Sequence, residues 1–598
     1  MQSLRKLLSL LTLSERQRLV VLMGMILGMA FLDMLGVASI MPFIAVLANP
    51  ELVQTNAMLN FAFNLSSYIG IVTPRQFLFA LGILVFVLLL TSLGFKALTT
   101  YAQIRFALMR EYSIGKRLVE GYLHQPYSWF LSRHSADLGK TILSEVSVVI
   151  GNGLLPLVTL IAHSMVALAL LILLLIVDPI LALSVGMVLA LAYVGMFVVL
   201  RGFLKRLGKA RIEANQERFT AVSEAFGAAK EVKVGGLEQF YIQRFAKPAK
   251  IYASGQASAK IISNLPRFAL EAVSFGGMLL VILYLMVKSG NLDAALPIIA
   301  LYAFAGYRLL PALQQIYGAI SQLRFAGPAV DVLSADLSSL QGANAQLASL
   351  SQLMLNQSIT LNHVSYRYPN SSKFALKNID LTIPAQSMVG FVGPTGSGKT
   401  TIVDLILGLL EPQEGRLSID DQYITAANCR QWQRSIGYVP QQIYLADDSV
   451  AANIAFGVSP KDIDQLAVER AAKIANLHEF VTKDLPHGYA TTVGERGVRL
   501  SGGQRQRIGI ARALYFNPQV LVMDEATSAL DNLTERAFME AVNHLRHDMT
   551  LILIAHRLST VRQCDHIYFL EEGELKASGT YEELKANNSK FAAMEAGN

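Results

Sequence analysis

Long apolar stretches separated by basic segments occupy the first half of the chain. An α-helix needs roughly 20 consecutive, mainly apolar residues to cross a bilayer. Stretches of this kind lie near residues 19–47, 77–100, 146–177, 179–203, 267–288 and 294–320. The first contains Asp33, Gly36 and Pro42, so we expect it to be bent or to extend beyond the bilayer. The pattern predicts a membrane α-helical domain of six transmembrane helices over residues 1–329.

Lysine and arginine are unevenly distributed among the connections between these stretches. They gather before the first stretch, between the second and third, and between the fourth and fifth, whereas the other connections carry only Arg75 and Lys288. Because positive residues accumulate on the cytoplasmic side of membrane proteins, we expect both termini and the two long basic connections to be cytoplasmic. The N-terminal segment MQSLRKLLSLL is expected to form a helix on the membrane surface and not a cleaved signal.

Two breaks interrupt the long basic connections, at Gln125–Asp137 and Glu224–Leu237. Turns there, near Trp129 and Lys230, would press on a cytoplasmic partner and transmit its movements to the membrane helices. Plain helical hairpins are the alternative. On the outer side, the long loop 49–75 contains an apolar segment that we expect either to lie along the membrane surface or to pack on the helix ends.

The second half of the chain has the pattern of a mixed α/β domain, preceded by a polar linker at residues 330–355. Its clearest motif is an apolar, β-like run that leads into GPTGSGKT and then into an apolar helix. This order matches G-x-x-x-x-G-K-[ST], in which glycines let backbone N–H groups surround the phosphates of a nucleotide. Lys399 would supply positive charge, and the Thr400 hydroxyl would bind Mg²⁺. The residues expected to bind the nucleotide here are Gly393, Pro394, Thr395, Gly396, Ser397, Gly398, Lys399, Thr400 and Thr401.

A second apolar run, within Gln519–Asp531, ends in two adjacent carboxylates. We expect Asp524 to hold Mg²⁺ and Glu525 to act as the general base that activates the attacking water. The alternative is that these carboxylates only cap a buried strand. A P-loop in the same domain favours the catalytic interpretation.

A glycine-rich turn, LSGGQ, lies between these two motifs and opens a basic helix. A helix N-terminus attracts anions, so the domain has two phosphate-binding helix ends, which is one too many for a single nucleotide. A head-to-tail homodimer resolves this, with Ser501, Gly502, Gly503 and Gln504 of one copy facing the P-loop of the other. His556 follows another apolar run, and we expect it to sense the γ-phosphate, although a lone histidine is more often structural.

The order of GPTGSGKT, VPQQ, LSGGQ, VMDEATSALD and IAHR resembles the ABC ATPase family. The resemblance implies that Tyr368 stacks on adenine and that Gln441 contacts Mg²⁺ and relays to the membrane domain. It also implies that Gly494–Arg496 contacts the cytoplasmic turns of an exporter and that Ser528–Asp531 forms the D-loop. Since every motif is intact, two copies would hydrolyse ATP at both composite sites, and residues 356–598 would form the nucleotide-binding domain.

Six spans followed by this domain resemble an ABC half-exporter, an ATPase coupled to transmembrane transport. The stretch LDMLGVASIMPFIAVLANPE, the long outer loop and the paired intramembrane basic residues resemble bacterial flippases of lipid-linked oligosaccharides, of the PglK type. This resemblance implies a multi-pass protein of the bacterial inner membrane with its nucleotide-binding domain in the cytoplasm. Its substrate would be a polyprenyl-pyrophosphate oligosaccharide or another amphipathic, lipid-linked molecule.

Three basic residues lie in or at the apolar stretches, and charges inside a membrane are costly and usually functional. Lys96, Arg267 and Arg308 would suit a pyrophosphate headgroup in a shared cavity. The alternatives are structural. Arg267 and Glu271 have the spacing of an ion pair on one helix face, and Lys96 and Arg308 have the length to snorkel to the cytoplasmic interface.

The same features bear on other classes of function. A multidrug, lipid or peptide exporter would share the same ATPase motifs, and an ATP-gated channel would not need the intact Glu525. A soluble ABC ATPase is excluded by the membrane spans. The net charge of +7 does not indicate nucleic-acid binding, because the basic residues of the first half lie in membrane-protein connections. Cys429 and Cys564 are not spaced as metal ligands.

Overall fold

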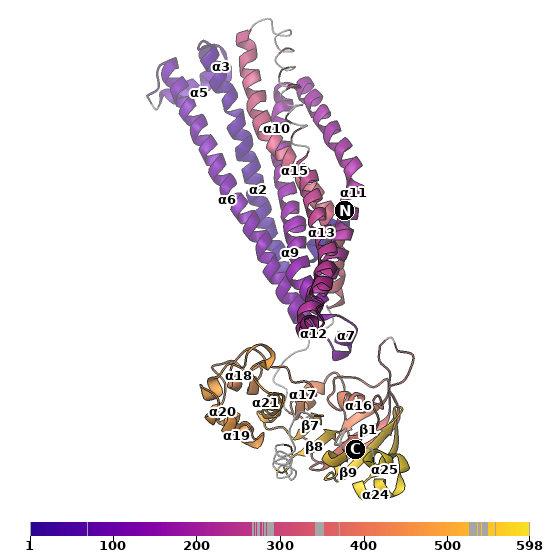
Figure 1. Cartoon of the computed structure of the whole chain (residues 1–598). Coiled ribbons are helices and arrows are strands. Elements are labelled where there is room, and N and C mark those ends of the chain that lie inside the picture. Colours follow the sequence, from indigo (N-terminus) through magenta and orange to yellow (C-terminus); the bar gives the residue numbers. More distant parts are fainter. Residues whose placement is uncertain are drawn as a thin grey trace. The chain divides into compact units, whose positions relative to one another are not determined.

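The chain folds into two compact units, one of membrane helices and one of mixed α/β structure (Figure 1). The first comprises Met1–Gln125 and Arg133–Asn344, and the second comprises Pro126–Ser132 and Ala345–Asn598. The computed structural model describes all residues except 1, 69, 266–267, 269–270, 272–275, 278, 280–282, 284–291, 341–351, 370, 526–534, 536–539, 541–547, 556–557 and 597–598.

The helices of the first unit are long, and several continue well past the thickness of a bilayer. Helix α6 has 50 residues, or about 75 Å at 1.5 Å per residue, against a hydrocarbon core of about 30 Å. The elements of this unit are α1 Gln2–Ser9, α2 Leu13–Ala38, α3 Ile40–Ala48, α4 Leu52–Thr55, α5 Ala57–Ser67, α6 Pro74–Leu123, α8 Ser135–Lys140, the π-helix η1 Thr141–Glu145, α9 Val146–Val149, the π-helix η2 Ile150–Leu154, α10 Leu155–Val177, α11 Pro179–Gly227, α12 Ala229–Val234, α13 Glu238–Asn264 and α15 Leu292–Ser339.

Four helical stretches in the described part of the chain are long and apolar enough to span a membrane: Leu13–Ala48, Pro74–Leu123, Ser135–Val177 and Pro179–Gly227. They coincide with the first four expected spans. The fifth, at 267–288, falls largely on residues outside the description, and the sixth lies within the 48-residue helix α15.

Local sequence signals explain where these helices begin. Thr12 forms a capping box with Glu15, and Thr73 forms one with Gln76. Asp178 accepts a hydrogen bond from the backbone N–H of Leu181 at the start of α11. Such caps satisfy N–H groups that have no partner within the helix.

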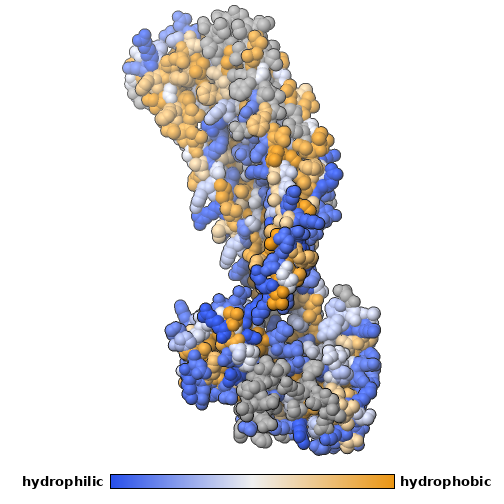
Figure 2. All heavy atoms as spheres, in the orientation of Figure 1, coloured by the Kyte–Doolittle hydropathy of each residue, from blue (hydrophilic) through white to orange (hydrophobic). Residues whose placement is uncertain are grey.

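The first unit has a small buried core and a largely apolar exterior. Its core includes Ile26, Leu170 and Leu301, which have no exposed surface. By contrast, Phe86 of α6 is 62% exposed and Val199 of α11 is 78% exposed. Hydrophobic residues gather over the part of the unit that carries α3, α5 and the start of α6 (Figure 2). Apolar surface of this extent is stable in lipid and not in water.

The outer loop 49–75 folds into α4 and α5, and both of the expected arrangements contribute. Phe63 packs edge-on against Phe77, with ring centroids 5.4 Å apart, so one face of α5 lies on the helix ends. On the other face, Met58 is 85% exposed and Phe61 is 70% exposed. That apolar face is available to the membrane surface.

Helix α15 continues into the segment expected to be a linker. Val330, Leu333, Leu337 and Leu340 are all buried, at a spacing that places them on one helix face. Polar residues lie between these positions, so the overall polar composition of the segment hid the periodicity of its apolar residues. The membrane unit therefore extends beyond residue 329 and into the expected linker at 330–355. Pro126–Ser132, with helix α7 (Tyr127–Leu131), departs from the expected division in the other direction, because it belongs to the α/β unit.

The α/β unit contains two sheets. Its other elements are β1 Ser358–Tyr366, β2 Leu376–Pro384, β3 Met388–Val392, α16 Lys399–Ile406, β4 Glu414–Ile419, β5 Gln422–Tyr423, α17 Cys429–Gln433, β6 Ile436–Val439, α18 Val450–Ile454, α19 Gln465–Ile474, α20 His478–Lys483, η3 Gly488–Ala490, η4 Glu495–Gly497, α21 Gly502–Leu514, β7 Val520–Asp524, β8 Thr550–Ile554, α23 Leu558–Val561, β9 His566–Glu571, β10 Glu574–Gly579, α24 Tyr581–Asn587 and α25 Ser589–Ala596. One sheet has the order β2-β1-β4-β5 and is antiparallel.

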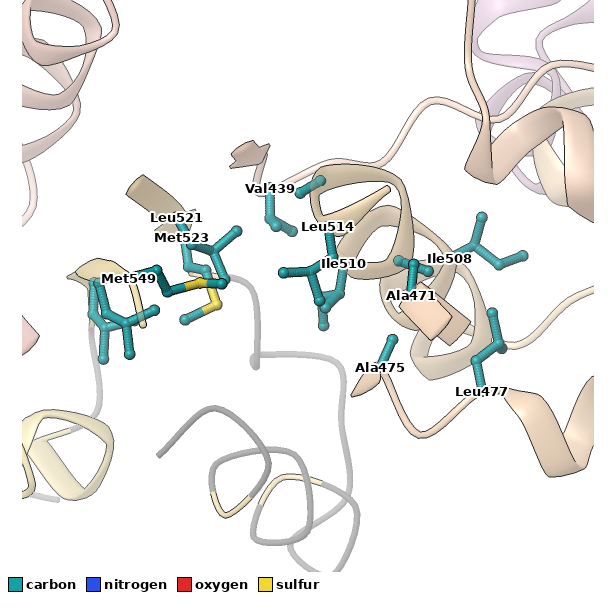
Figure 3. Close-up of a cluster of buried hydrophobic side chains, with 14 of the residues drawn as sticks. Val439, Ala471, Ala475, Leu477, Ile508, Ile510, Leu514, Leu521, Met523 and Met549 are labelled. Carbon is teal, nitrogen blue, oxygen red and sulfur yellow. The ribbon is translucent and has the colours of Figure 1, made fainter. Parts of the chain in front are cut away.

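The second sheet has the order β10-β9-β3-β8-β7-β6, and all of its strands except β10 run parallel. Strands β3, β7 and β8 are buried along their whole length, as expected for a parallel sheet covered on both faces. Apolar side chains of β6, β7, α19 and α21 form one of its cores (Figure 3). Since parallel strands end at the same edge, the loops after β3 and β7 meet there.

Candidate functional site

The P-loop follows β3 and is a tight backbone turn that depends on glycine. Gly393, Gly396 and Gly398 have φ angles of +150°, +80° and +104°. A Cβ atom at Gly393 would lie 2.1 Å from the carbonyl oxygen of Leu570. No side chain fits at this position. Glycine therefore lets the loop turn tightly enough to direct its backbone N–H groups toward its own interior, at the start of α16.

Lys399 begins α16, and its ammonium group is held inside the loop. Its Nζ donates to the carbonyl oxygens of Gly393 at 2.8 Å and Pro394 at 3.0 Å. Lys399 is only 5% exposed. Burial lowers the pKa of Lys399, while the nearby Glu525 and Asp524 oppose that effect. The direct hydrogen-bond partners of the ammonium group are thus two neutral carbonyl oxygens, and a nucleotide phosphate would replace them as its partner.

Tyr368 lies beside the first turn of α16. Its hydroxyl is 3.1 Å from the Thr401 hydroxyl, and its ring meets that of Tyr366 edge-on. Burial raises the pKa of Tyr368.

Glu525, in the loop after β7, contacts Gln441, in the loop after β6. Gln441 donates from Nε2 to Glu525 Oε2 at 2.7 Å. Glu525 has a φ of +51°, which is unfavourable for a residue with a side chain, and its N–H donates to the carbonyl of Ile554 at 3.1 Å. Gln506 of α21 also donates to the Glu525 carbonyl, at 3.3 Å. This conformation directs the carboxylate toward Gln441, away from the strand axis.

The residues expected to hold Mg²⁺ have the chemistry that the ion requires. Thr400 offers a hydroxyl, Gln441 an amide oxygen and Asp524 a carboxylate, and Mg²⁺ prefers such hard oxygen ligands together with substrate phosphates. Asp524 ends β7 and is 6% exposed. Within the described residues there is no cluster of three or more His, Cys, Asp or Glu.

Sequence reasoning missed Asp404, a partly buried carboxyl on α16. Burial, reinforced by the charge of Asp524, raises the pKa of Asp404 to about 6. The same carboxyl raises the pKa of Tyr127 of α7, after burial as the larger cause. The available signal was its position on the P-loop helix, one turn after Thr400, where an acidic residue faces the edge of the sheet.

The LSGGQ segment forms the second expected helix N-terminus. Ser501 caps α21 by accepting from the N–H of Gln504 at 3.2 Å, and Gln504 accepts from the N–H of Ser501 at 2.8 Å. Gly502 and Gly503 are the first residues of the helix. This reciprocal capping box presents an ordered set of N–H groups at an accessible surface. Ser528–Asp531 and His556 lie outside the described residues.

In the membrane unit, Lys96 and Arg308 share one carboxylate, that of Asp33. Arg308 NH1 lies 3.2 Å from Asp33 Oδ1, and Lys96 Nζ lies 3.7 Å from Oδ2. Ser92 donates a hydrogen bond to Oδ1 at 2.5 Å. The Asp33 side chain is fully buried, whereas those of Arg308 and Lys96 are 13% and 34% exposed. Snorkelling to the interface therefore does not fully describe Lys96 and Arg308, because both cations have a buried partner.

Sequence reasoning used Asp33 only as evidence for a bend in the first span. The sequence nevertheless indicated that Asp33 needs a partner, because an acidic residue inside an apolar span is costly unless it is paired. The third basic residue considered there, Arg267, lies outside the description.

Comparison with known proteins gives consistent results for both units. The family "ABC transporter transmembrane region" matches residues 25–307, and the family "ABC transporter" matches residues 376–528. An ATP-dependent lipid A-core flippase of Cupriavidus pinatubonensis is 32% identical over 482 residues, which cover 80% of each chain. That of Ralstonia nicotianae is 31% identical over 507 residues, again covering 80% of each.

A solved structure shares the fold. The structure of a bacterial Atm1-family ABC exporter with ATP bound aligns with a TM-score of 0.78, 24% identity, and coverage of 97% of this chain and 98% of that one. Together with the P-loop, the capping box at Ser501 and the paired Gln441 and Glu525, these likenesses identify the architecture and its energy source. The chain belongs to the ABC transporter family, as a multi-pass membrane exporter domain fused to an ATPase domain that drives transport.

Proposed function

We propose that two copies of this chain form a flippase that uses ATP and Mg²⁺ to move a phosphate-bearing lipid across the bacterial inner membrane. The observation that carries this proposal is the pair of cations, Lys96 and Arg308, in the membrane unit against one carboxylate. The three charges sum to +1. A net positive charge in an apolar environment favours an anionic headgroup over a neutral or cationic drug.

An apolar cavity in the same unit supports a lipid as the substrate. It has a volume of about 420 Å³ and is lined by residues of α10, α11 and α15, including Leu168, Leu171, Ala190, Val194, Leu309 and Leu313. Leu309 directly follows Arg308 in the chain. Tyr193 and Tyr317 also line the cavity, and the buried hydroxyl of Tyr193 has no hydrogen-bond partner within the described part of the protein. A hydrocarbon chain with an oxygen-bearing group would fill the space and use this donor.

The finer proposal for the substrate is a polyprenyl-pyrophosphate oligosaccharide. A pyrophosphate offers enough oxygen atoms to engage an arginine and a lysine together. Lipid A-core is a second candidate, because relatives at 31–32% identity are named as lipid A-core flippases. Both candidates combine phosphate with long apolar chains, so the cation pair and the cavity suit either one.

ATP would drive the cycle through residues of the α/β unit. Lys399 and the P-loop N–H groups would bind the phosphates, while the Ser501 end of α21 from the second copy would close the site. Thr400, Gln441 and Asp524 would hold Mg²⁺, which neutralises phosphate charge when bound. Glu525 would accept a proton from the attacking water, with Gln441 orienting its carboxylate. The turn at Trp129 would carry the closure to the membrane helices.

The test is the ATPase rate of the purified protein in lipid nanodiscs, with a polyprenyl-pyrophosphate oligosaccharide, with lipid A-core, and with neither. Stimulation by the first alone supports the oligosaccharide proposal, and stimulation by lipid A-core alone supports the second candidate. In either case the stimulation should decrease strongly in Arg308→Ala. Stimulation only by uncharged apolar drugs would contradict a phosphate-bearing substrate.

A further inference from the structure

Asp33 lies where two membrane cations meet, and its surroundings distinguish it from an ordinary structural ion pair. The carboxylate comes from α2, Lys96 from α6 and Arg308 from α15, so three helices converge on a single negative charge. Breaking such a pair inside a membrane leaves an uncompensated charge, which is strongly unfavourable. Some anion must therefore accompany Lys96 and Arg308 in every state that the protein visits.

The cations are more accessible than the carboxylate that holds them. Asp33 has no exposed side-chain surface, Arg308 has 13% and Lys96 has 34%. An anion approaching this site would therefore meet Lys96 first and Arg308 second. It would reach both without needing to displace Asp33 from its own position.

The bonds to Asp33 differ in strength. Oδ1 accepts from Ser92 and from Arg308, whereas Oδ2 is buried without a hydrogen bond and faces Lys96 only as a charge at 3.7 Å. Lys96 is thus loosely held and can turn to a new partner. If Arg308 also leaves, the Ser92 hydroxyl still donates to Oδ1, so Asp33 retains a partner on α6.

We propose that Asp33 is a resident counter-ion that the phosphate of the substrate replaces on Lys96 and Arg308, and that pairs with them again when the substrate leaves. This inference rests on the proposed function and adds a positioning and release role for Asp33. A phosphate is the better partner during binding, because it presents more oxygens to the guanidinium than one carboxylate oxygen does. Asp33 is the better partner afterwards, because it is covalently part of the chain and always present at high local concentration.

The proposal predicts opposite effects on binding and on turnover in Asp33→Asn. Without the competing carboxylate, phosphate lipid should bind more tightly, with a half-saturating concentration roughly tenfold lower. Release should become slow, because no anion replaces the phosphate, so the maximal stimulated ATPase rate and the flipping rate should decrease. A residue needed only for folding would instead weaken both binding and turnover.

The experiment uses the full-length protein in nanodiscs and proteoliposomes, with a polyprenyl pyrophosphate and lipid A as separate probes. The half-saturating probe concentration and the maximal rate are measured for the wild type, Asp33→Asn, Asp33→Ser and Asp33→Glu. Asp33→Glu keeps the charge and should restore both values toward those of the wild type. The matched control is Asp331→Asn, which removes an exposed carboxylate of the same unit that pairs with Lys6 at 2.6 Å.

The outcomes separate this inference from the function on which it rests. If neither probe affects the wild type, the proposed function fails and the role of Asp33 fails with it. If a probe stimulates the wild type but binds equally or more weakly in Asp33→Asn and Asp33→Ser, the counter-ion proposal alone is contradicted. Should Asp33→Asn not accumulate in the membrane, Asp33→Ser gives the same comparison with a smaller side chain that can still bond to Ser92.

Discussion

The P-loop and the membrane charge cluster both hold cations that we propose to bind phosphate, yet they hold those cations in different ways. Lys399 is fixed by two carbonyl oxygens of its own loop, six and five residues away in the chain. Arg308 is held by a carboxylate 275 residues away. The hold on Lys399 is a local property of a short segment and forms wherever that segment folds. The membrane charge cluster exists only while α2, α6 and α15 keep their arrangement, so its affinity for anions depends on conformation.

The largest effect is expected where the local site performs chemistry. Glu525→Gln should reduce ATP hydrolysis by about 10²- to 10⁴-fold, because the amide cannot accept the proton of the attacking water. ATP binding should survive, and the two copies should accumulate in a closed, ATP-bound form. Phosphate release and chemical cross-linking of the dimer measure these two effects. Brisk turnover in this variant would mean that Glu525 is not the general base.

The dependence of the local site on backbone geometry can be tested by adding one methyl group. Gly393→Ala places a Cβ 2.1 Å from the Leu570 carbonyl oxygen, so ATP affinity should decrease by more than about tenfold. Gly396→Ala is the matched control, since its Cβ would meet no atom within 4 Å and only the positive φ opposes it. Titration with a fluorescent nucleotide compares the two. Equal affinities would show that loop crowding at Gly393 is unimportant.

The long-range site should instead reveal itself as coupling between helices. Arg308→Ala leaves the buried Asp33 with only the Ser92 hydroxyl and the Lys96 charge at 3.7 Å, and should destabilise the membrane unit by as much as about 3–5 kcal/mol. The double variant Arg308→Ala with Asp33→Asn should recover part of that loss, because the fully buried carboxylate is gone and the charge that remains, Lys96, is partly exposed. Thermal unfolding in detergent of the wild type, both single variants and the double variant measures the stability differences of this double-mutant cycle. Strictly additive losses would show that the two side chains do not interact, and the contrast between local and long-range sites would then disappear.

The smallest effect concerns Asp404, whose pKa is raised to about 6 by burial and by Asp524. A carboxyl with a raised pKa binds its proton more tightly in the folded state than in the unfolded state, so it destabilises the protein above pH 6. That penalty disappears as the pH falls through 6 toward the ordinary value. Asp404→Asn should therefore raise the melting temperature of the ATPase unit at pH 7.5 and lose this advantage near pH 4. Parallel melting curves against pH would contradict the shift.

The same contrast explains what was predictable from sequence. Gly393–Thr400 could be recognised because its function resides in contiguous backbone, and the structure places it at the strand-to-helix junction that was expected. The capping box at Ser501 is equally local. Asp33 could be noticed as an anomaly, but its partners could not be named, because Ser92 lies 59 residues away and Arg308 lies 275 away. The boundary at residue 329 failed for a related reason: α15 is stabilised by contacts made after the helices assemble, which composition does not show.

Helix α7 has a consequence for how this protein can be divided. The segment Pro126–Ser132 lies in the sequence between two long membrane helices, but it is grouped with the α/β unit. Burial and then the nearby Asp404 raise the pKa of its Tyr127, and Tyr127 in turn contributes to the raised pKa of Tyr438, whose largest cause is burial. An ATPase fragment beginning at residue 345 would lack this segment and would expose the surface that it covers. The two structural units therefore do not correspond to two contiguous stretches of sequence. An isolated ATPase fragment would need α7 added as a separate peptide to regain its native surface.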